Sequence, residues 1–249
     1  MMTDRYAVIG CPIEHSLSPL IHTQFAQQTG LVLTYEKIVA EETEFESMVV
    51  DFFKTGGKGL NVTLPYKERA FKLADVTTPR AREAKAANTL WMHEGKLHAD
   101  TTDGIGLVRD LSRYITLKHK RVLLLGAGGA ARSVIGALFE AEIAALTVLN
   151  RTASKAKALQ QDFPSITLEI QGGYDVVLNA TSALEIVLPN HCLTAKTYCY
   201  DFMYNQKAPT PFVTWARSKG CEARDGFGML VEQAVESFWI WHGVRPRSM

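Results

Sequence analysis

The stretch RVLLLGAGGAARSVIGAL constrains the fold of this chain more than any other. The apolar run Val122–Leu125 is followed at once by glycines, and then by a segment with helical spacing that ends near Ala141. Gly126, Gly128 and Ala131 fit the pattern GxGxxG/A, in which missing side chains let the backbone turn tightly from a strand into a helix. Such turns belong to parallel sheets covered by helices, so the sequence predicts an α/β fold.

The same loop predicts a phosphate site. The first turn of a helix presents free N–H groups and a positive partial charge, and small residues let a pyrophosphate approach the backbone. A turn that merely needs small residues is the plainer alternative, but the strand before it and the helix after it favour a dinucleotide. The residues expected to contact it are Gly126, Ala127, Gly128, Gly129, Ala130 and Ala131.

The stretch VLNRTASKA indicates which dinucleotide is bound. In such folds the second strand ends beside the adenine ribose, where an acid binds the ribose hydroxyls. Here that position holds Asn150, Arg151 and Thr152. An arginine grips a 2′-phosphate that an acid would repel, so the sequence predicts NADP(H). Lys155 reaches the same phosphate if Thr152 caps the following helix, although a solvated basic helix start remains the alternative.

Further strands of this half are continuous apolar runs, namely LTVLN, YDVVLNAT and TYCYDF. Such runs are typical of a parallel sheet buried on both faces. Polar residues stand where these strands end, at Asn150, Asn179 and Asp201. Ligands of open parallel sheets bind beyond the carboxyl ends of the strands, so this edge is the expected cofactor side.

The N-terminal half also alternates strands and helices. The expected strands are residues 5–10, 34–39 and 58–64, the expected helices are residues 19–30, 43–55, 66–73 and 79–87, and residues 88–100 read as a hairpin. A last helix is expected over residues 229–242, ended by Gly243 and Pro246. Two α/β units with a cleft between them follow from this pattern.

Polar side chains near strand ends mark a second site in the N-terminal half. Ser16 and Ser18 precede a helix with Pro19 in its first turn, an arrangement that suits a carboxylate, with ordinary N-capping by Ser18 as an equal alternative. Asn61 and Thr63 end a strand on one face, with Lys67 just beyond. A lysine at a helix start is more often solvated, and an aspartate before glycine, as at Asp103, is more often a turn.

Composition excludes several classes of function. Twenty-seven basic and 26 acidic residues leave a net charge of +1, which offers no field to attract nucleic acid or an acidic membrane. No apolar run approaches the ~20 residues that span a bilayer. The four cysteines form no CxxC pair and no signal-peptide pattern stands at the start, so we expect a cytoplasmic protein. The seven histidines lack metal-ligand spacing, and His93, His98 and Asp100 read as the polar edge of the hairpin, so no metal is assigned.

Nine motifs in order resemble the shikimate dehydrogenase family over nearly the whole chain. They are GxPxxHSxSPxxH, NVTxPxK, AANT, TDGxG, GAGGAAR, NRT, NATS, DxxY and DGxGMLxxQA. The resemblance implies a substrate domain over residues 1–102, an NADP-binding Rossmann domain over residues 103–228, and a C-terminal helix, 229–249, that returns to the first domain. It implies reduction of 3-dehydroshikimate to shikimate by NADPH, in a monomer or homodimer.

The resemblance also assigns roles by motif. Lys67 and Asp103 resemble the catalytic pair. The implied substrate ligands are Ser16 and Ser18 for the carboxylate and, around the ring, Asn61, Thr63, Asn88, Asp103, Tyr204 and Gln233. The implied cofactor and cleft residues are Asn179, Thr181, Met203, Gly226 and Met229.

Some positions depart from the family pattern. Thr101 and Thr23 stand where asparagine is frequent, residues 163–174 are shorter than usual, and ALEIVLP follows NATS where a turn rich in serine and glycine is usual. These departures affect the loop expected on the nicotinamide side. Two other functions stay open: a quinate/shikimate dehydrogenase with relaxed substrate or cofactor choice, and a non-catalytic NADPH-binding regulator.

Overall fold

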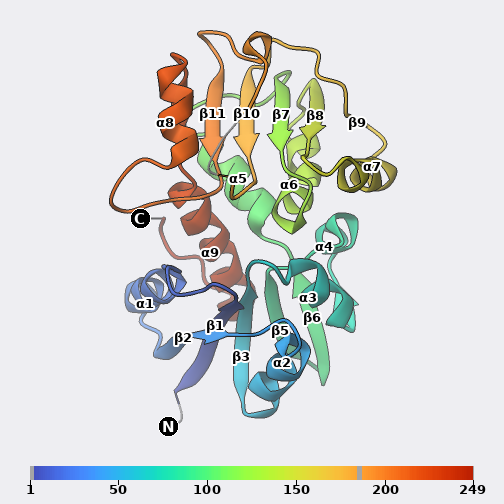
Figure 1. Ribbon diagram of the computed structural model, residues 1–249. Helices are drawn as coiled ribbons and strands as arrows, with labels where there is room; N and C mark the ends of the chain where they lie inside the picture. Colours follow the sequence, from blue (N-terminus) through green and yellow to red (C-terminus); the bar gives the residue numbers. More distant parts are fainter. Residues whose placement is uncertain (1–2, 184–186, 249) are drawn as a thin grey trace. The chain divides into compact units, whose positions relative to one another are not determined.

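The computed structural model describes residues 3–183 and 187–248 and confirms the α/β class (Figure 1). The helices are α1 (Ser18–Thr29), α2 (Phe45–Lys54), α3 (Lys67–Leu73), α4 (Pro79–Ala84), α5 (Asp103–Leu111), α6 (Gly129–Glu140), α7 (Ala153–Asp162), α8 (Pro211–Ser218) and α9 (Phe227–His242), with a 3₁₀ turn at Asn190–Cys192. The strands are β1 (Asp4–Gly10), β2 (Leu33–Val39), β3 (Gly57–Val62), β4 (Val76–Thr77), β5 (Thr89–His93), β6 (Lys96–Asp100), β7 (Arg121–Leu125), β8 (Ala145–Leu149), β9 (Ile166–Thr167), β10 (Val176–Asn179), β11 (Tyr198–Asp201) and β12 (Glu222–Arg224). Part of the ALEIVLP segment, residues 184–186, lies outside the described residues.

The chain divides into two compact units. Unit 1 comprises Met1–Leu107 and Leu230–Met249, and unit 2 comprises Val108–Met229. The chain first passes from unit 1 to unit 2 after Leu107, inside α5, and not at residue 102. Asp103 begins a continuous helix and not the turn that an aspartate before glycine favours. An acidic residue in a first helical turn is stabilised by the helix dipole, which favours this start.

Unit 1 is built on a mixed sheet in the order β2-β1-β3-β5-β6-β4. Strands β2, β1 and β3 run parallel, whereas β5 is antiparallel to both β3 and β6. The expected hairpin β5–β6 turns at Glu94 and Gly95, both with positive φ, which matches the right-handed twist of the two strands. The parallel strands therefore end together, and the chain leaves β3 directly toward Lys67.

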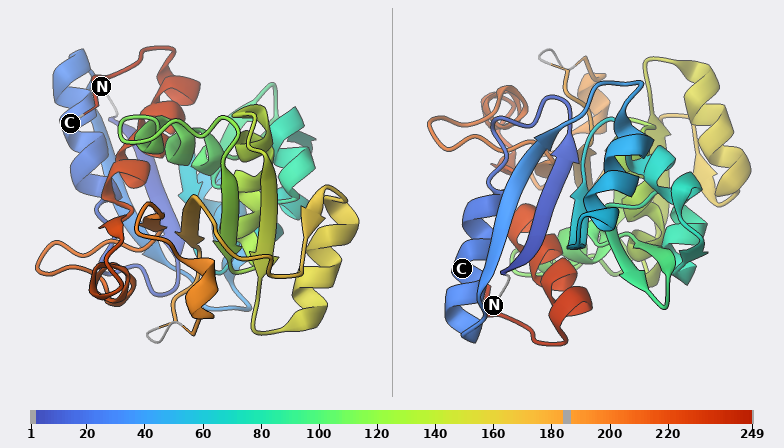
Figure 2. Two further views of the ribbon diagram at one scale, coloured as in Figure 1. Left: turned by 90° about the horizontal axis from the view of Figure 1, so that it is seen from above. Right: turned by 90° about the horizontal axis from the view of Figure 1, so that it is seen from below.

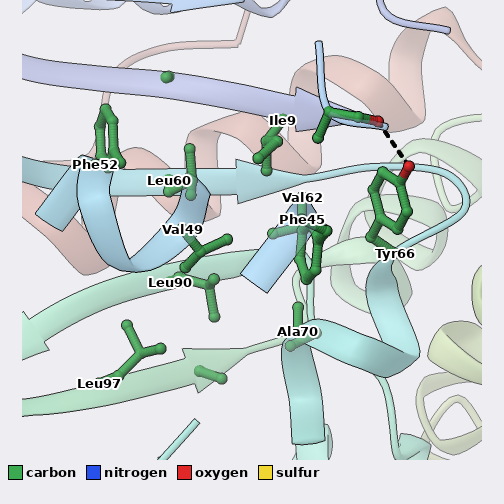
Figure 3. Packing of buried hydrophobic residues seen from close by; sticks show 14 residues of the cluster. Ile9, Phe45, Val49, Phe52, Leu60, Val62, Tyr66, Ala70, Leu90 and Leu97 are labelled. Atoms are coloured by element: carbon green, nitrogen blue, oxygen red, sulfur yellow. Dashed lines mark hydrogen bonds between the residues drawn. The ribbon is translucent and has the colours of Figure 1, made fainter. Parts of the chain in front are cut away.

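Two apolar clusters hold unit 1 together. Phe45, Val49 and Phe52 of α2 pack with Leu60 and Leu90 of the sheet, as Figure 3 shows, and the view of Figure 2 from below shows α2 lying against the strands. The Tyr66 hydroxyl within this cluster donates to the Ala40 carbonyl at 2.7 Å. A second cluster joins Ile21 and Phe25 of α1 to Val231, Val235 and Phe238 of α9. The last helix thus packs in unit 1, as expected, and covers the apolar side of α1.

Unit 2 is a fully parallel sheet in the order β12-β11-β10-β7-β8-β9. The residues of β10 and β11 are all buried, as expected for strands covered on both faces. The strand order reverses direction at β7, which is paired with β10 on one side and β8 on the other. Ligands of such sheets bind at this switch point, just where β7 runs into the glycine loop.

Several elements differ from those expected. Helix α4 ends at Ala84 and not at Ala87, because Lys85 adopts a left-handed φ of 49° and terminates it. Strands β4, β9 and β12 and helix α8 are further elements without a sequence prediction; the three strands are only two or three residues long and carry no detectable period. Within the described ranges, no helix is long and apolar enough to cross a membrane.

Candidate active site

A buried ion pair lies at the carboxyl end of the unit 1 sheet. Lys67 is the first residue of α3 and Asp103 the first residue of α5, and Lys67 Nζ contacts Asp103 Oδ2 at 2.5 Å. The two side chains are only 11% and 5% exposed. Lys67 is therefore buried and paired, and the alternative of a solvated lysine at a helix start is wrong. Buried charges persist only when they are paired, so each of these two groups requires the other.

Asn88 connects this pair to the last helix. Its Nδ2 donates to Asp103 Oδ1 at 2.9 Å, to the Thr102 hydroxyl at 2.9 Å and to Gln233 Oε1 at 3.2 Å. Its Oδ1 accepts from the Thr102 N–H and from the Thr89 hydroxyl, both at 2.9 Å. The structure thus brings Lys67, Asp103, Asn88 and Gln233 into one hydrogen-bonded group.

Asn61, on β3, is hydrogen-bonded to this group. Its Nδ2 donates to the Asn88 carbonyl and to the Ser237 hydroxyl, each at 3.0 Å, and its Oδ1 accepts from the Tyr35 hydroxyl at 2.7 Å. Burial raises the pKa of Tyr35 well above its ordinary value, while a hydrogen bond with Ser18 opposes that shift. Tyr35 keeps its proton, so it serves as a fixed donor to Asn61.

Ser16 and Ser18 lie together at the start of α1. Ser16 Oγ contacts Ser18 Oγ at 3.2 Å and accepts from the Ser18 N–H at 3.3 Å. The N-cap residue is Leu17 and no side chain caps the helix, so N-capping by Ser18 is wrong. Two adjacent hydroxyls beside a helix start, linked through Tyr35 to Asn61, are suited to hold a carboxylate at one end of the group.

Two further residues expected to bind the substrate are Thr63 and Tyr204. Thr63 follows β3, and its methyl group packs so closely over Gly10 that a Cβ there would lie 2.4 Å from Thr63 Cγ2. Tyr204 is half-buried in the segment after β11, in unit 2.

Four residues of the network, Tyr35, Thr89, Thr102 and Ser237, are not predicted from the sequence. Ser237 contacts Asn61 and the hydroxyls of Thr89 and Thr102, the latter two at 2.8 and 3.3 Å. The available signals were weak: Ser237 stands one helical turn after Gln233 on α9, and Thr102 immediately precedes Asp103. Thr89 carried no signal beyond its place in the hairpin.

The glycine loop of unit 2 has room for a ligand. Gly126 has φ 113°, and a Cβ there would lie 3.1 Å from the Ala180 carbonyl oxygen, so packing alone requires glycine. Gly128 is different. It is the N-cap of α6, its φ is negative, and a Cβ there would meet nothing within 4 Å. The fold itself does not require glycine at this position, which fits a pyrophosphate lying against the loop and the start of α6.

The basic residues after β8 are exposed. Arg151, Thr152 and Lys155 lie on the surface, and Asn150 Nδ2 donates to the Thr152 carbonyl at 2.9 Å. Thr152 is the N-cap residue of α7, but its side chain makes no capping hydrogen bond, so that part of the prediction is wrong. The Thr152 hydroxyl and the Arg151 guanidinium are therefore available to a 2′-phosphate.

Asn179 and Asp201 fix the ends of β10 and β11. Asn179 Nδ2 donates to Asp201 Oδ1 at 3.0 Å, and Asn179 Oδ1 accepts from the Thr181 hydroxyl at 2.7 Å. Asp201 also accepts from the Thr210 hydroxyl at 2.6 Å and from the Met203 N–H at 3.1 Å. Burial raises the pKa of Asp201, and these donors oppose the shift. Asp201 thus holds the two segments that carry Thr181 and Met203.

Gly226 and Met229 lie where α9 begins. A Cβ on Gly226 would lie 2.5 Å from the Phe202 carbonyl oxygen, so backbone packing accounts for this glycine. The Met229 N–H donates to the Tyr200 hydroxyl at 3.1 Å. Met203 is largely exposed, at 45%. Among the described residues no group of three or more His, Cys, Asp or Glu side chains could hold a metal, and Asp100 is buried beside Arg80 and not at a polar edge.

Comparison with known families identifies both units. Residues 8–90 match the model of the shikimate dehydrogenase substrate binding domain, and residues 109–201 match the model of shikimate / quinate 5-dehydrogenase. A curated shikimate dehydrogenase (NADP(+)) from Legionella pneumophila strain Lens is 56% identical over 253 residues, which cover 98% of this chain and 96% of the relative.

Solved structures agree. Shikimate 5-dehydrogenase from Thermus thermophilus, in complex with NADP(H) and shikimate, superposes with a TM-score of 0.89 at 32% identity, covering 98% of this chain and 95% of that chain. The ligand-free 5-ketofructose reductase of Gluconobacter sp. strain CHM43 superposes with a TM-score of 0.83 at 28% identity, covering 99% of this chain and 95% of that chain. The fold is therefore shared with a reductase named for a different substrate.

Proposed function

This chain belongs to the shikimate dehydrogenase family of NADP+-dependent oxidoreductases, and from that premise we propose that unit 1 binds 3-dehydroshikimate and unit 2 binds NADPH. The observation that carries the proposal is the buried Lys67–Asp103 pair, joined through Asn88 to Gln233. Reduction of the ketone gives shikimate. A second α/β unit with an open glycine loop supports the NADP(H) role.

Lys67 is the proposed general acid. When bound, NADPH supplies the hydride that adds to the ketone carbon. The developing alkoxide then requires a proton within hydrogen-bond distance, and Lys67 Nζ carries three. Asp103 holds that ammonium group in place through its Oδ2, and Asn88 holds the other carboxylate oxygen. The position of the acid is thus set before substrate arrives, which lowers the entropic cost of the step.

The remaining polar groups of unit 1 orient the ring. Ser16 and Ser18 are the proposed ligands of the substrate carboxylate, at the start of α1. Asn61, Thr63, Asn88 and Gln233 are the proposed contacts of the ring hydroxyls, and Tyr204 is a further proposed substrate ligand. Anchoring both ends of a small ring presents one face of the ketone to the hydride.

In unit 2 the proposed cofactor contacts follow the carboxyl edge of the sheet. The glycine loop takes the pyrophosphate, and Asn150, Arg151, Thr152 and Lys155 take the adenine ribose with its 2′-phosphate. The segments after β10 and β11, with Asn179, Thr181 and Met203, and the start of α9, with Gly226 and Met229, are proposed for the nicotinamide side.

The deciding experiment is an initial-rate assay of the whole protein. NADP+ or NAD+ is supplied with shikimate or quinate, and absorbance of the reduced cofactor is followed. We expect turnover with shikimate and NADP+, and a much lower kcat/KM with NAD+ or with quinate. Comparable rates with quinate or NAD+ would identify a quinate/shikimate dehydrogenase of relaxed choice. NADPH binding without turnover of either substrate would identify a non-catalytic regulator.

We further propose that the protein works in the cytoplasm as a monomer or homodimer. All four cysteines are free thiols, which supports a reducing compartment. Light scattering coupled to size exclusion measures the oligomeric state, and a larger assembly would contradict the proposal.

A further inference from the structure

A cluster of buried charges lies next to the ion pair but outside it. Asp100, the last residue of β6, is 3% exposed and precedes Asp103 by one short turn. Arg80 of α4 pairs with it through two parallel contacts, Nε to Oδ1 at 2.7 Å and Nη2 to Oδ2 at 2.6 Å. Asp100 Oδ1 also accepts from the Thr78 hydroxyl at 2.5 Å and from the Thr101 N–H at 2.7 Å.

The same guanidinium reaches the last helix. Arg80 Nη1 lies 3.5 Å from Glu236 Oε1 on α9, and the Glu236 side chain is 4% exposed. Glu236 stands between Gln233, which contacts Asn88 and Thr102, and Ser237, which contacts Thr102. Arg245 contacts the other Glu236 oxygen at 2.9 Å. One side chain thus joins the turn that carries Thr102 and Asp103 to the helix that carries Gln233.

We propose that Arg80 is a positioning residue for the substrate site, an inference that rests on the function proposed for unit 1. The planar guanidinium fork fixes distance and angle toward Asp100 while it reaches Glu236, which a single ammonium group does not reproduce. The guanidinium group therefore fixes the position of α9 relative to the turn between β6 and α5. Gln233 and Thr102 are held at the spacing that Asn88 requires, and the ring hydroxyls of the substrate meet a preset group.

Loss of Arg80 has two effects that an experiment can separate. Arg80→Met leaves Asp100 buried without its cation, which destabilises the fold whether or not Arg80 positions the site. The triple variant with Arg80→Met, Asp100→Asn and Glu236→Gln also removes the charge of Asp100, which has lost its cation, and the charge of Glu236, which Arg245 still contacts. The melting temperature of the triple variant should be close to that of the parent. The guanidinium group that positions α9 against the β6–α5 turn is still absent.

The test measures KM and kcat for shikimate, KM for NADP+ and the thermal melt of the parent, Arg80→Met, Arg80→Lys and the triple variant. Activity of the parent is established first, so a failed function is distinguished from a failed positioning role. We expect kcat/KM for shikimate to fall about tenfold in all three variants, since small misplacements at a site are costly, while KM for NADP+ changes less than twofold. Arg5→Met, which breaks the exposed pair Arg5–Glu36 in the same unit, should change neither constant.

Three results would overturn the proposal. If the triple variant regains both stability and kcat/KM for shikimate, Arg80 only neutralises buried charge. If Arg80→Lys has the same KM and kcat for shikimate as the parent, a positive charge suffices and the planar guanidinium group does not position the site. An equal loss for shikimate and NADP+ would point to general destabilisation of the protein.

Discussion

The residues proposed for the substrate site of unit 1 and those proposed for the cofactor phosphates in unit 2 differ in burial. In unit 1, Asn61, Lys67, Asn88 and Asp103 are buried and bonded to one another. In unit 2, the basic residues around Arg151 are exposed, and the glycine loop leaves open space at Gly128. We infer from this difference that the proposed substrate site is held in place by the protein's own hydrogen bonds, whereas the basic residues proposed for the 2′-phosphate of the cofactor are exposed. A catalytic step requires side chains that are held in fixed positions, whereas the binding of a large anion requires side chains that the anion can reach.

The largest effect is expected from the loss of Lys67, the proposed general acid in unit 1. Lys67→Met keeps much of the side-chain stem and removes the ammonium group, so kcat should fall by ~10²–10⁴-fold with a far smaller change in KM. Steady-state kinetics measure the effect, with a thermal melt to verify folding. Lys72→Met, at an exposed position of the same helix, is the matched control. Turnover within a few-fold of the parent would remove Lys67 from the mechanism and direct attention to Asp103.

The next largest effect is expected at Arg151, in the exposed basic segment of unit 2. Arg151→Ala should weaken NADPH roughly ten- to hundredfold, because one charged hydrogen bond contributes on the order of 1.5–3 kcal/mol, and should weaken NADH much less. Titration of both cofactors measures the ratio. Lys157 lies on α7, the helix that follows Arg151, and is also exposed, so Lys157→Ala serves as the control. Equal losses for NADPH and NADH would show that Arg151 does not read the 2′-phosphate.

A smaller effect is expected at the start of α1. Replacing Ser16 and Ser18 together by alanine should raise KM for shikimate about tenfold, because two hydrogen bonds to the carboxylate are lost, and leave KM for NADP+ unchanged. Ser47→Ala on α2 controls for loss of an exposed hydroxyl. A lower melting temperature with an unaltered KM for shikimate would mean that the two serines only stabilise the helix start.

The last effect concerns stability in acid and leaves activity at neutral pH unchanged. Burial, with a contribution from nearby His242, lowers the pKa of His22 from its ordinary 6.5 to about 3. Between those values the unfolded chain binds a proton at His22 that the folded chain does not. The free energy of unfolding therefore falls as the pH falls through that window, by up to about 1.4 kcal/mol per pH unit.

His22→Phe should flatten that acid slope. Urea unfolding at pH 7, 5.5 and 4.5 measures it, with His15→Phe at an exposed position as the control. A slope that His22→Phe leaves unchanged would show that another group governs the acid limb.

Sequence reasoning reached the elements with a strong period and the residues at strand ends. Strand β7, the glycine turn and α6 were predicted because an apolar run, small residues and helical spacing follow one another without interruption. Helix α5 was missed, since Gly104 and Gly106 disguise its apolar face as a turn. The ion pair expected between Lys67 and Asp103 is confirmed, although the helix that Asp103 begins is not predicted.

The buried hydroxyl layer could not be read from sequence. Thr89 and Ser237 lie far apart in the chain and meet only because α9 returns to β5, with Ser237 Oγ 2.8 Å from Thr89 Oγ1. Nothing local distinguishes Ser237 from a solvent-exposed helix serine. Asp100 was read as a polar edge for the same reason: its partner Arg80 is supplied by another element.

The difference between the two units is tested most directly by calorimetric titration of shikimate into the protein without NADP(H). A site already built in unit 1 should give saturable binding at one site per chain, and Arg151→Ala should leave that binding unchanged. The same titration in the presence of NADPH serves as the reference. Binding heat that appears only when NADPH is present would contradict the account, because the substrate site would then be formed by the cofactor and not by the hydrogen bonds around Asn88.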